Sequence, residues 1–259
     1  MFAFRASAGP VELAFTDRHG GVSTGPYASL NLAASSGDSA TAVAENLRRA
    51  VVALTTVRTD AEAPTDAAAS AATEPPPVIG MHQVHGNQVA VVGPEDAAGG
   101  GFPVADALVT AQPGLVLMAR AADCVPVLLA DPEAGVVAAV HSGRPGVAAG
   151  VVTRAVETMR ECGAERILGW VGPHVCGACY EVPEPLREEV AAVVPETFAT
   201  TSWGTPSLAI GAGVTAQLIA AGVEVRDAAS CTREDDDLFS YRRQGKASGR
   251  LAGLIWIRP

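Results

Sequence analysis

The chain has 259 residues, of which 48% are hydrophobic and 18% are charged, and this composition excludes a chain that is disordered throughout. Its formal net charge of -10 argues against non-specific binding to nucleic acid or anionic membranes, while leaving room for one local basic pocket that binds a small anion. Arg120, Asp123 and Asp131 interrupt the most hydrophobic region and the N-terminus lacks an export-signal pattern, so we expect no membrane-spanning helix and a cytoplasmic location.

The first third of the chain predicts one helix, an insertion and two strands. Apolar residues recur at helical spacing in residues 41–54, and Asp38 or Ser39 could cap the start of this helix. Residues 57–77 are rich in Ala, Thr and Pro, which is typical of a flexible surface insertion. Residues 78–92 predict a strand, a tight turn and a second strand.

The rest of the chain alternates between short apolar runs and helical patterns. The predicted strands are residues 114–121, 125–131, 135–142, 166–172, 238–244 and 251–258, and the predicted helices are residues 146–162, 185–194 and 208–222. This alternation predicts a mixed α/β fold. Neither a G-x-G-x-x-G opening a helix after a strand nor a P-loop pattern occurs, which argues against a Rossmann domain and a nucleotide-triphosphate motor.

Three residues at predicted junctions of strands and loops are candidates for catalysis. His85 lies in HQVHG, Cys124 in ADCVPVLL and His141 in VHSGRPG. Two imidazoles and one thiolate can hold zinc and leave a fourth position open, which is typical of a catalytic site. A second interpretation makes Cys124 a nucleophile with a histidine as its base. By spacing alone, a capping histidine, a buried cysteine and a turn histidine explain the same residues equally well.

Seven blocks of this sequence, taken in order, resemble one known family. They are RHGGVSTGPYASLNLA (18–33), QVHGNQV (83–89), ADALVT (105–110), AADCVPVLLAD (121–131), VHSGRPGVAAG (140–150), GPHVCGACYEV (172–182) and CTREDDDLFSYRRQGKASGRLAGLIWI (231–257). Together they resemble the YfiH family of purine nucleoside phosphorylases, also called laccase-domain or multicopper polyphenol oxidase-like proteins. The resemblance covers nearly the whole chain.

The resemblance implies a fold, an activity and a set of ligands. It implies one catalytic domain over residues 1–259, a layered α/β/β/α sandwich with mixed sheets similar to the catalytic domain of cytotoxic necrotizing factor. It implies that His85, Cys124 and His141 bind zinc and serve in catalysis. The implied reaction is phosphorolysis of adenosine, inosine and methylthioadenosine, with adenosine deaminase as a side activity. The implied partners are a purine nucleoside and phosphate, and we expect a monomer or a small homo-oligomer.

Two other functions stay open beside this one. The first is a Cys-His amide hydrolase, because Cys124 and the histidines would also serve that chemistry; the family resemblance attaches a role in cell-wall precursor editing. The second is a non-enzymatic protein that binds purine or metal. A laccase mechanism is not expected, because five histidines cannot supply a blue-copper site and a trinuclear cluster together. We therefore expect any copper bound in vitro to be adventitious.

Several residues are weaker candidates for contacts with substrate. Where the family usually has H-A-G-W-R-G, residues 141–146 read HSGRPG, and Arg144 with the N–H groups of the following helix could bind phosphate or could form an ordinary turn. The other candidates are Arg18, Ser29, Asn31, Arg242 and Arg243. Because Arg242 and Arg243 are adjacent in a predicted strand, we expect only one of them to face the pocket.

The five cysteines are odd in number, so we expect no disulfide framework. Cys176 and Cys179 form a C-x-x-C, but no second pair completes a four-cysteine zinc site, which favours packing or a bystander thiol. No histidine has Glu two residues later, which excludes cytidine-deaminase chemistry.

Overall fold

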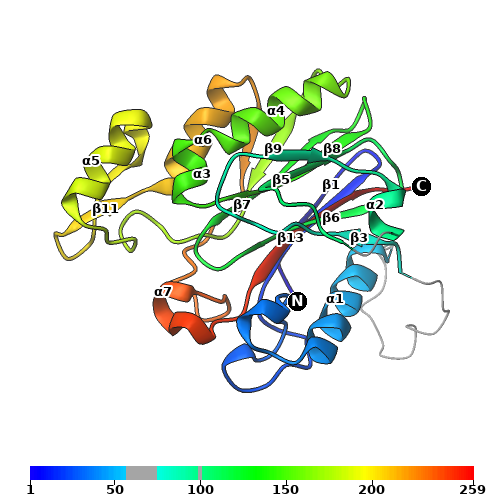
Figure 1. Ribbon diagram of the computed structural model, residues 1–259, viewed down its shortest axis with the longest axis horizontal. Coiled ribbons are helices and arrows are strands. Elements are labelled where there is room, and N and C mark those ends of the chain that lie inside the picture. The colour runs from blue at the N-terminus through cyan, green and yellow to red at the C-terminus, as the bar shows by residue number, and fades with distance from the viewer. Residues whose placement is uncertain (57–74, 99–100) are drawn as a thin grey trace.

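Two β-sheets lie face to face in the structure, a computed structural model that describes residues 1–56, 75–98 and 101–259 (Figure 1). The five-stranded sheet has the order β1 (Phe2–Ala8), β2 (Val11–Thr16), β13 (Leu251–Ile257), β6 (Val116–Ala121), β3 (Val78–Ile79). The six-stranded sheet has the order β12 (Glu224–Asp227), β9 (Leu168–Val171), β7 (Val125–Asp131), β8 (Val136–Ser142), β5 (Ala107–Thr110), β4 (Val89–Val91). Both sheets mix parallel and antiparallel pairs.

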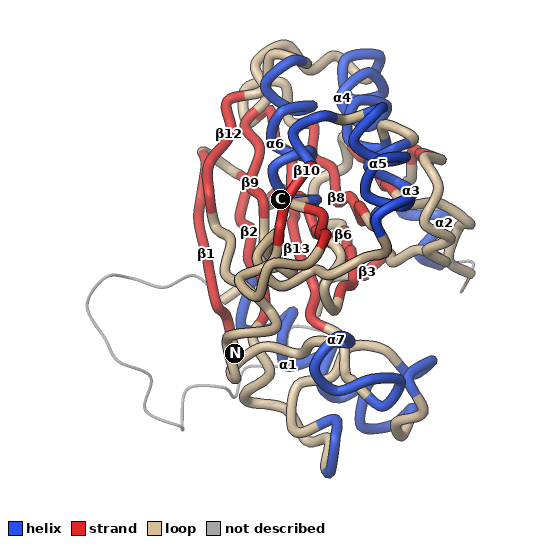
Figure 2. The backbone as a smooth tube through the Cα atoms, turned by 90° about the vertical axis from the view of Figure 1, so that its left-hand side faces the viewer, coloured by secondary structure: helices blue, strands red, loops and turns tan. Residues whose placement is uncertain are grey.

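Helices cover the outer faces of both sheets, as Figure 2 shows from the side. The helix α1 (Ala40–Thr55) packs on the five-stranded sheet, and α3 (Arg144–Ala148), α4 (Val151–Glu161) and α6 (Ile210–Ala220) pack on the six-stranded sheet. The remaining elements are α2 (Pro94–Ala98), α5 (Glu184–Val193), α7 (Tyr241–Gln244) and a small sheet of β10 (Phe198–Thr200) and β11 (Pro206–Leu208). The layers confirm the expected α/β/β/α sandwich. None of the described helices has the length and apolarity needed to cross a membrane.

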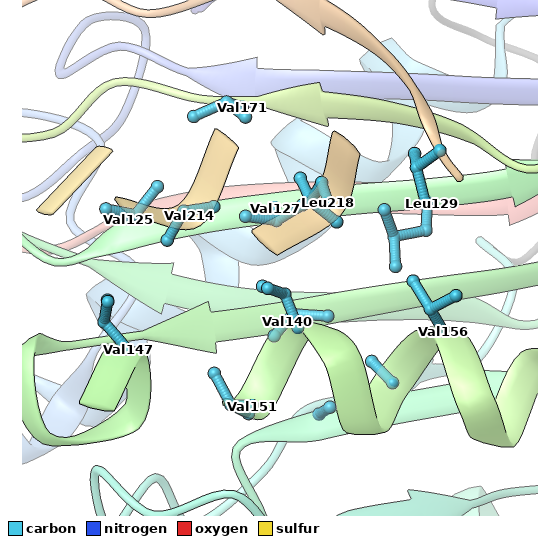
Figure 3. Close-up of a cluster of buried hydrophobic side chains, with 14 of the residues drawn as sticks. Val125, Val127, Leu129, Val140, Val147, Val151, Val156, Val171, Val214 and Leu218 are labelled. Atoms are coloured by element: carbon cyan, nitrogen blue, oxygen red, sulfur yellow. The ribbon is translucent and has the colours of Figure 1, made fainter. Parts of the chain in front are cut away.

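Three apolar clusters hold the layers together. In β7, Val127 and Leu129 pack under the helices, as Figure 3 shows, while Leu128 and Ala130 face the other sheet. Successive side chains of a strand point to opposite faces, so a strand covered on both sides is apolar at every position. This is why the central strands have uninterrupted apolar sequences. A third cluster joins α1 to the outer face of the five-stranded sheet.

Most predicted elements are confirmed. The strands expected within residues 114–121, 125–131, 135–142, 166–172 and 251–258 are β6, β7, β8, β9 and β13, and the helices at 41–54 and 185–194 are α1 and α5. Ser39 caps α1, because its side chain accepts a hydrogen bond from the backbone N–H of Ala42. The insertion predicted at 57–77 lies almost entirely outside the described residues.

Three local predictions are wrong, and one predicted helix is confirmed with a later start. The strand expected at 238–244 does not form: residues 238–240 are irregular and residues 241–244 form the helix α7, whose first turn is capped by Ser240. The helix expected at 146–162 is divided into α3 and α4, because Gly150 adopts a φ of 71° between them. The helix expected at 208–222 begins only at Ile210, since residues 206–208 pair with β10. The tight turn expected within 78–92 is a longer loop that passes from one sheet to the other.

Candidate functional site

The structure brings His85, Cys124 and His141 together, although they come from three separate elements. His85 lies in the loop between β3 and β4, Cys124 in the turn between β6 and β7, and His141 near the end of β8. One side-chain donor atom from each residue lies within 4.8 Å of the others. The distance from Cys124 Sγ to His85 Nε2 is 3.8 Å, and the two imidazole rings meet edge to face.

A buried carboxylate, Asp106, orients two of these three residues. Its Oδ1 accepts a hydrogen bond of 2.8 Å from Nδ1 of His141, so in the neutral ring Nε2 is the nitrogen with a free lone pair. The carboxylate also accepts the backbone N–H groups of Val84, His85 and Gly86, and so fixes the loop that carries His85. Sequence reasoning missed Asp106. The sequence shows it only as an acidic residue directly before the apolar run that forms β5.

The turn that presents Cys124 is held by its neighbour Asp123. Asp123 has a φ of 85°, a conformation that is uncommon outside glycine. Its carboxylate accepts hydrogen bonds from the hydroxyls of Thr232 and Ser240 and from the backbone N–H of Arg242. Asp123 therefore fastens the cysteine turn to α7, rather than contacting the two histidines.

Charge is redistributed between the thiol and the imidazole. Burial by itself raises the pKa of Cys124, but the neighbouring His141 and His85 outweigh it and lower that pKa to about 6. Burial by itself lowers the pKa of His141, but Asp106 and Cys124 raise it to about 9. The two groups therefore favour a thiolate beside an imidazolium when no cation is bound. A thiolate is both a good ligand for a soft cation and a nucleophile.

The site has room for a further atom only because residue 143 is glycine. A Cβ at Gly143 would lie 2.5 Å from Cδ2 of His85 and 3.1 Å from Sγ of Cys124. Two imidazoles and one thiolate are the donor types that zinc prefers, and the second imidazole nitrogen of His141 is bound to a carboxylate, as is usual for a zinc-binding histidine. The residues present thus fit a metal centre with three protein ligands.

These residues open into a cavity of about 600 Å³. The cavity wall contains four arginines, and none of them forms an ion pair with a carboxylate among the described residues. They are Arg120, Arg144, Arg242 and Arg250. Arg120 and Arg250 are half-buried, and this burial lowers the pKa of each guanidinium. A chain of net charge -10 thus has a cationic cavity beside its candidate metal centre.

Two of the predicted substrate contacts line the cavity, and four do not. Arg144 and Arg242 lie in its wall, and the guanidinium of Arg242 stacks over the ring of Tyr180. Arg18, Ser29, Asn31 and Arg243 are outside the lining and bond to the protein instead. The fully buried Asn31, for example, donates a hydrogen bond of 2.9 Å to Asp38. Because α7 is a helix, the expected alternation of Arg242 and Arg243 across a strand does not apply.

Sequence reasoning also missed several polar residues of the lining, among them Gln83, Arg120 and Arg250. Arg120 donates to the carbonyl of Met81, and the side chain of Gln83 bonds to both the N–H and the carbonyl of Arg120. These bonds anchor the His85 loop to β6. Arg250 precedes β13, so it reaches the cavity from the strand next to β6. These residues are far apart in sequence, and only the pairing of β13 with β6 brings them together.

Comparisons with known proteins agree with one another. The family model described as "Multi-copper polyphenol oxidoreductase laccase" matches residues 12–63 and 57–258. A purine nucleoside phosphorylase of Streptomyces griseus is 50% identical over 96% of this chain and 95% of that protein. The purine nucleoside phosphorylase YfiH of Shigella flexneri is 35% identical over 93% of this chain and 91% of that protein. A crystal structure of the Neisseria meningitidis protein NMB0706 matches with a TM-score of 0.80 and 30% identity, covering 99% of both chains.

Proposed function

The chain belongs to the YfiH family, which the laccase model describes, and from this premise we propose that it is a zinc-dependent purine nucleoside phosphorylase. The proposed substrates are adenosine, inosine and methylthioadenosine, with adenosine deamination as a side activity. The observation that carries the proposal is the cavity itself, in which a centre of two histidines and one cysteine adjoins four arginines that have no carboxylate partner in the described part of the chain. Phosphorolysis needs a site of this kind, because its second substrate is inorganic phosphate.

In phosphorolysis, an oxygen of phosphate attacks C1′ of the ribose and the bond from C1′ to N9 of the purine breaks. The electron pair of that bond leaves with the purine, which takes up a proton. Guanidiniums hold phosphate through paired N–H groups, and a partly dehydrated guanidinium binds it more strongly. We assign this role to Arg144 and Arg242, which both lie beside Tyr180, and to Arg120 and Arg250, which also line the cavity.

His85, Cys124 and His141 would hold the metal in this proposal. When bound there, zinc would supply a Lewis acid beside the substrate. Asp106 would keep Nε2 of His141 aimed at the metal position, and Gly143 would keep that position free of a side chain. Adenosine deamination, in which water replaces the exocyclic amine and ammonia leaves, would use the same cavity without phosphate.

A second candidate function rests on one specific observation. The thiol of Cys124 contacts His141, and His141 in turn bonds to Asp106, as in a catalytic triad of nucleophile, base and orienting carboxylate. The pKa of the Cys124 thiol is also lowered to about 6. In a Cys-His amide hydrolase, the thiolate would attack an amide carbonyl, His141 would give its proton to the leaving amine, and water would then hydrolyse the thioester. A cell-wall precursor amide is the substrate that this alternative predicts.

Metal content and adenosine turnover distinguish the two candidates. We expect Cys124→Ser to lose one zinc per chain together with phosphate-dependent release of adenine and ribose 1-phosphate. Cys162→Ser is the matched control, since this cysteine ends α4 and does not line the cavity. If Cys124→Ser retains the full zinc content, or if metal-stripped wild type releases adenine at the full rate, the zinc phosphorylase proposal fails. Amide hydrolysis by the metal-stripped protein would then favour the second candidate.

The arginines provide a separate test of the phosphate site. We expect Arg144→Ala and Arg242→Ala to raise the KM for phosphate while zinc content stays unchanged. Arg154→Ala is the control, because Arg154 lies on α4 and pairs with Glu157. An unchanged phosphate KM in both cavity variants would remove the role assigned to these arginines.

The family model's name describes a copper enzyme, but five histidines are too few for a full multicopper set, so we propose that copper binding is adventitious. Phenol oxidation should then follow added copper rather than bound zinc. Full-rate oxidation by zinc-only protein would contradict this. The cytoplasmic location and the monomeric or small oligomeric state stay predictions.

A further inference from the structure

A second group of metal-binding side chains lies away from the histidines. It consists of Cys176 and Cys179, in the loop after β9, and Cys231 and Glu234, in the turn after β12. One donor atom from each of the four lies within 4.8 Å of the others. The C-x-x-C had no visible partner in the sequence, because Cys231 is more than fifty positions away from it.

The backbone around these sulfurs has hydrogen bonds that suit bound thiolates. The N–H groups of Cys179 and Tyr180 both donate to the carbonyl of Cys176, which closes a tight turn and brings the two sulfurs to one side. The N–H of Cys176 points at Sγ of Cys231 with a distance of 3.4 Å. Amide N–H groups directed at sulfur stabilise the negative charge that a bound thiolate carries.

The donor set is complete for a tetrahedral soft cation. Three sulfurs and one carboxylate oxygen make four ligands, the number found in closed, structural zinc sites. Glu234 forms no ion pair with an arginine, lysine or histidine among the described residues, so its charge is available to a metal ion. A disulfide between two of the cysteines would leave the third unpaired and would give Glu234 no role.

We propose that Cys176, Cys179, Cys231 and Glu234 bind a second zinc ion, which is structural rather than catalytic. All four positions are filled by protein, in contrast to the three-ligand centre at His85, Cys124 and His141.

This ion would brace one wall of the cavity. Cys179 directly precedes Tyr180, and Cys231 and Glu234 lie in the segment that leads into α7, which carries Arg242. The two segments already meet, since the N–H of His174 donates to Ser230 and the N–H of Thr232 donates back to His174. A metal bound across them would fix the stacked pair of Arg242 and Tyr180 at the edge of the cavity.

Zinc content tests the proposal once the other centre has been removed. The full-length Cys124→Ser chain, purified under reducing conditions without chelator, should retain one zinc per chain. Adding Cys231→Ser or Glu234→Gln to it should lose that zinc or weaken its binding at least tenfold, whereas adding Cys162→Ser should not. A zinc-free Cys124→Ser chain, or equal zinc content in all the double variants, overturns the proposal.

A spectroscopic readout covers the case in which Cys231→Ser does not fold. Cobalt bound to the Cys124→Ser chain should show thiolate-to-metal charge-transfer absorption of the strength expected for several sulfurs, without any change to the second group. A chelator should lower the Tm of this chain, because the ion binds only the folded state. Absence of the absorption, or recovery of fewer than four free thiols after denaturation without reductant, overturns the proposal in favour of an empty or disulfide-bonded group.

Discussion

Asp106 is the residue on which the His85 loop and His141 both depend. It is fully buried, and its carboxylate accepts three backbone N–H groups and one imidazole N–H. These four donors all need an acceptor, which a carboxylate with two oxygens supplies. The negative charge also favours the protonated Nδ1 of His141 and thereby keeps the other nitrogen available to a metal.

We expect Asp106→Asn to lower zinc affinity at the His85, Cys124 and His141 centre by about 10–100-fold. The amide has one oxygen and an NH₂ group, so it cannot accept every donor that the carboxylate accepts, and it lacks the charge. Competition with a chromogenic chelator measures the affinity. Asp227→Asn is the control, because Asp227 is exposed and its carboxylate bonds, among the described residues, to the nearby N–H of Ala229 alone. Equal zinc affinity in the two variants would show that Asp106 does not support the metal site.

The lowered pKa of Cys124 predicts selective alkylation of the metal-stripped protein. The thiolate is the reactive form, so its reaction with iodoacetamide should rise through about pH 6 and level off near neutral pH. Burial raises the pKa of Cys162, Cys176 and Cys179, so these thiols should react at this rate only in alkaline solution. Mass spectrometry of peptides across a pH series measures each site. A midpoint for Cys124 near pH 8.5, the value for a free thiol, would contradict the thiolate pair.

The three residues of the candidate metal centre could be expected from the sequence, and the contacts of the other polar residues could not. The resemblance pointed to His85, Cys124 and His141 because each lies in its own block. Asn31 and Arg243 looked like substrate contacts for a physical reason: a side chain that binds phosphate and one that binds backbone carbonyls need the same donors. Only the fold shows that Arg243 donates to the carbonyls of Thr232 and Arg233.

At the scale of elements, α7 shows how a contact distant in sequence overrides a local pattern. Leu238 and Phe239 gave this segment a strand-like start, and both are buried. Ser240 then caps a helical turn by accepting the N–H of Arg243, and Asp123 accepts both the Ser240 hydroxyl and the N–H of Arg242. Asp123 is more than one hundred positions away, so no window of local sequence includes it.

Ser240→Ala should therefore affect both stability and substrate binding. The loss of a helix cap and of a buried hydrogen bond lowers the free energy of unfolding by about 1–2 kcal/mol. The less ordered α7 should also raise the KM for phosphate, because Arg242 lies on it. Denaturant titration and initial rates measure the two effects. Ser39→Ala at the cap of α1 is the control and should lower stability without changing KM; a KM rise in both variants would contradict the local explanation.

The central strands were the most predictable elements, since a strand buried on both faces needs an apolar residue at each position. The division of 146–162 into α3 and α4 was less visible. Apolar residues continue on both sides of Gly150, so periodicity alone joins the two helices, whereas the left-handed conformation of Gly150 separates them.

At the scale of the whole molecule, one aromatic ring joins the two sheets. Phe15 on β2 is almost fully buried and packs between the sheets. It lies opposite Gly253 of β13, where a Cβ would be 3.0 Å from the ring, and it also fills the space beside Gly172, which follows β9. The two glycines leave space for the ring of Phe15. The ring therefore fixes how the two sheets pack against each other at this point.

Phe15→Ala should lower the free energy of unfolding by about 3–5 kcal/mol, because it removes a buried ring and leaves a cavity between the sheets. Chemical denaturation followed by tryptophan fluorescence measures the loss. The same substitution at Phe198, which is 55% exposed, should cost far less. Similar losses for the two variants would contradict the central place given to Phe15.

The position of β13 has a consequence for synthesis of the chain. This strand, residues 251–257, lies between β2 and β6 in the middle of its sheet, and residue 250 before it is a cavity arginine. While the ribosome is still making the chain, β2 and β6 have nothing between them and present unpaired edges to other nascent chains. The sheet closes only after residue 257 has left the exit tunnel. Ribosome stalling before that point would therefore release a product with two unpaired strand edges, which is prone to aggregation.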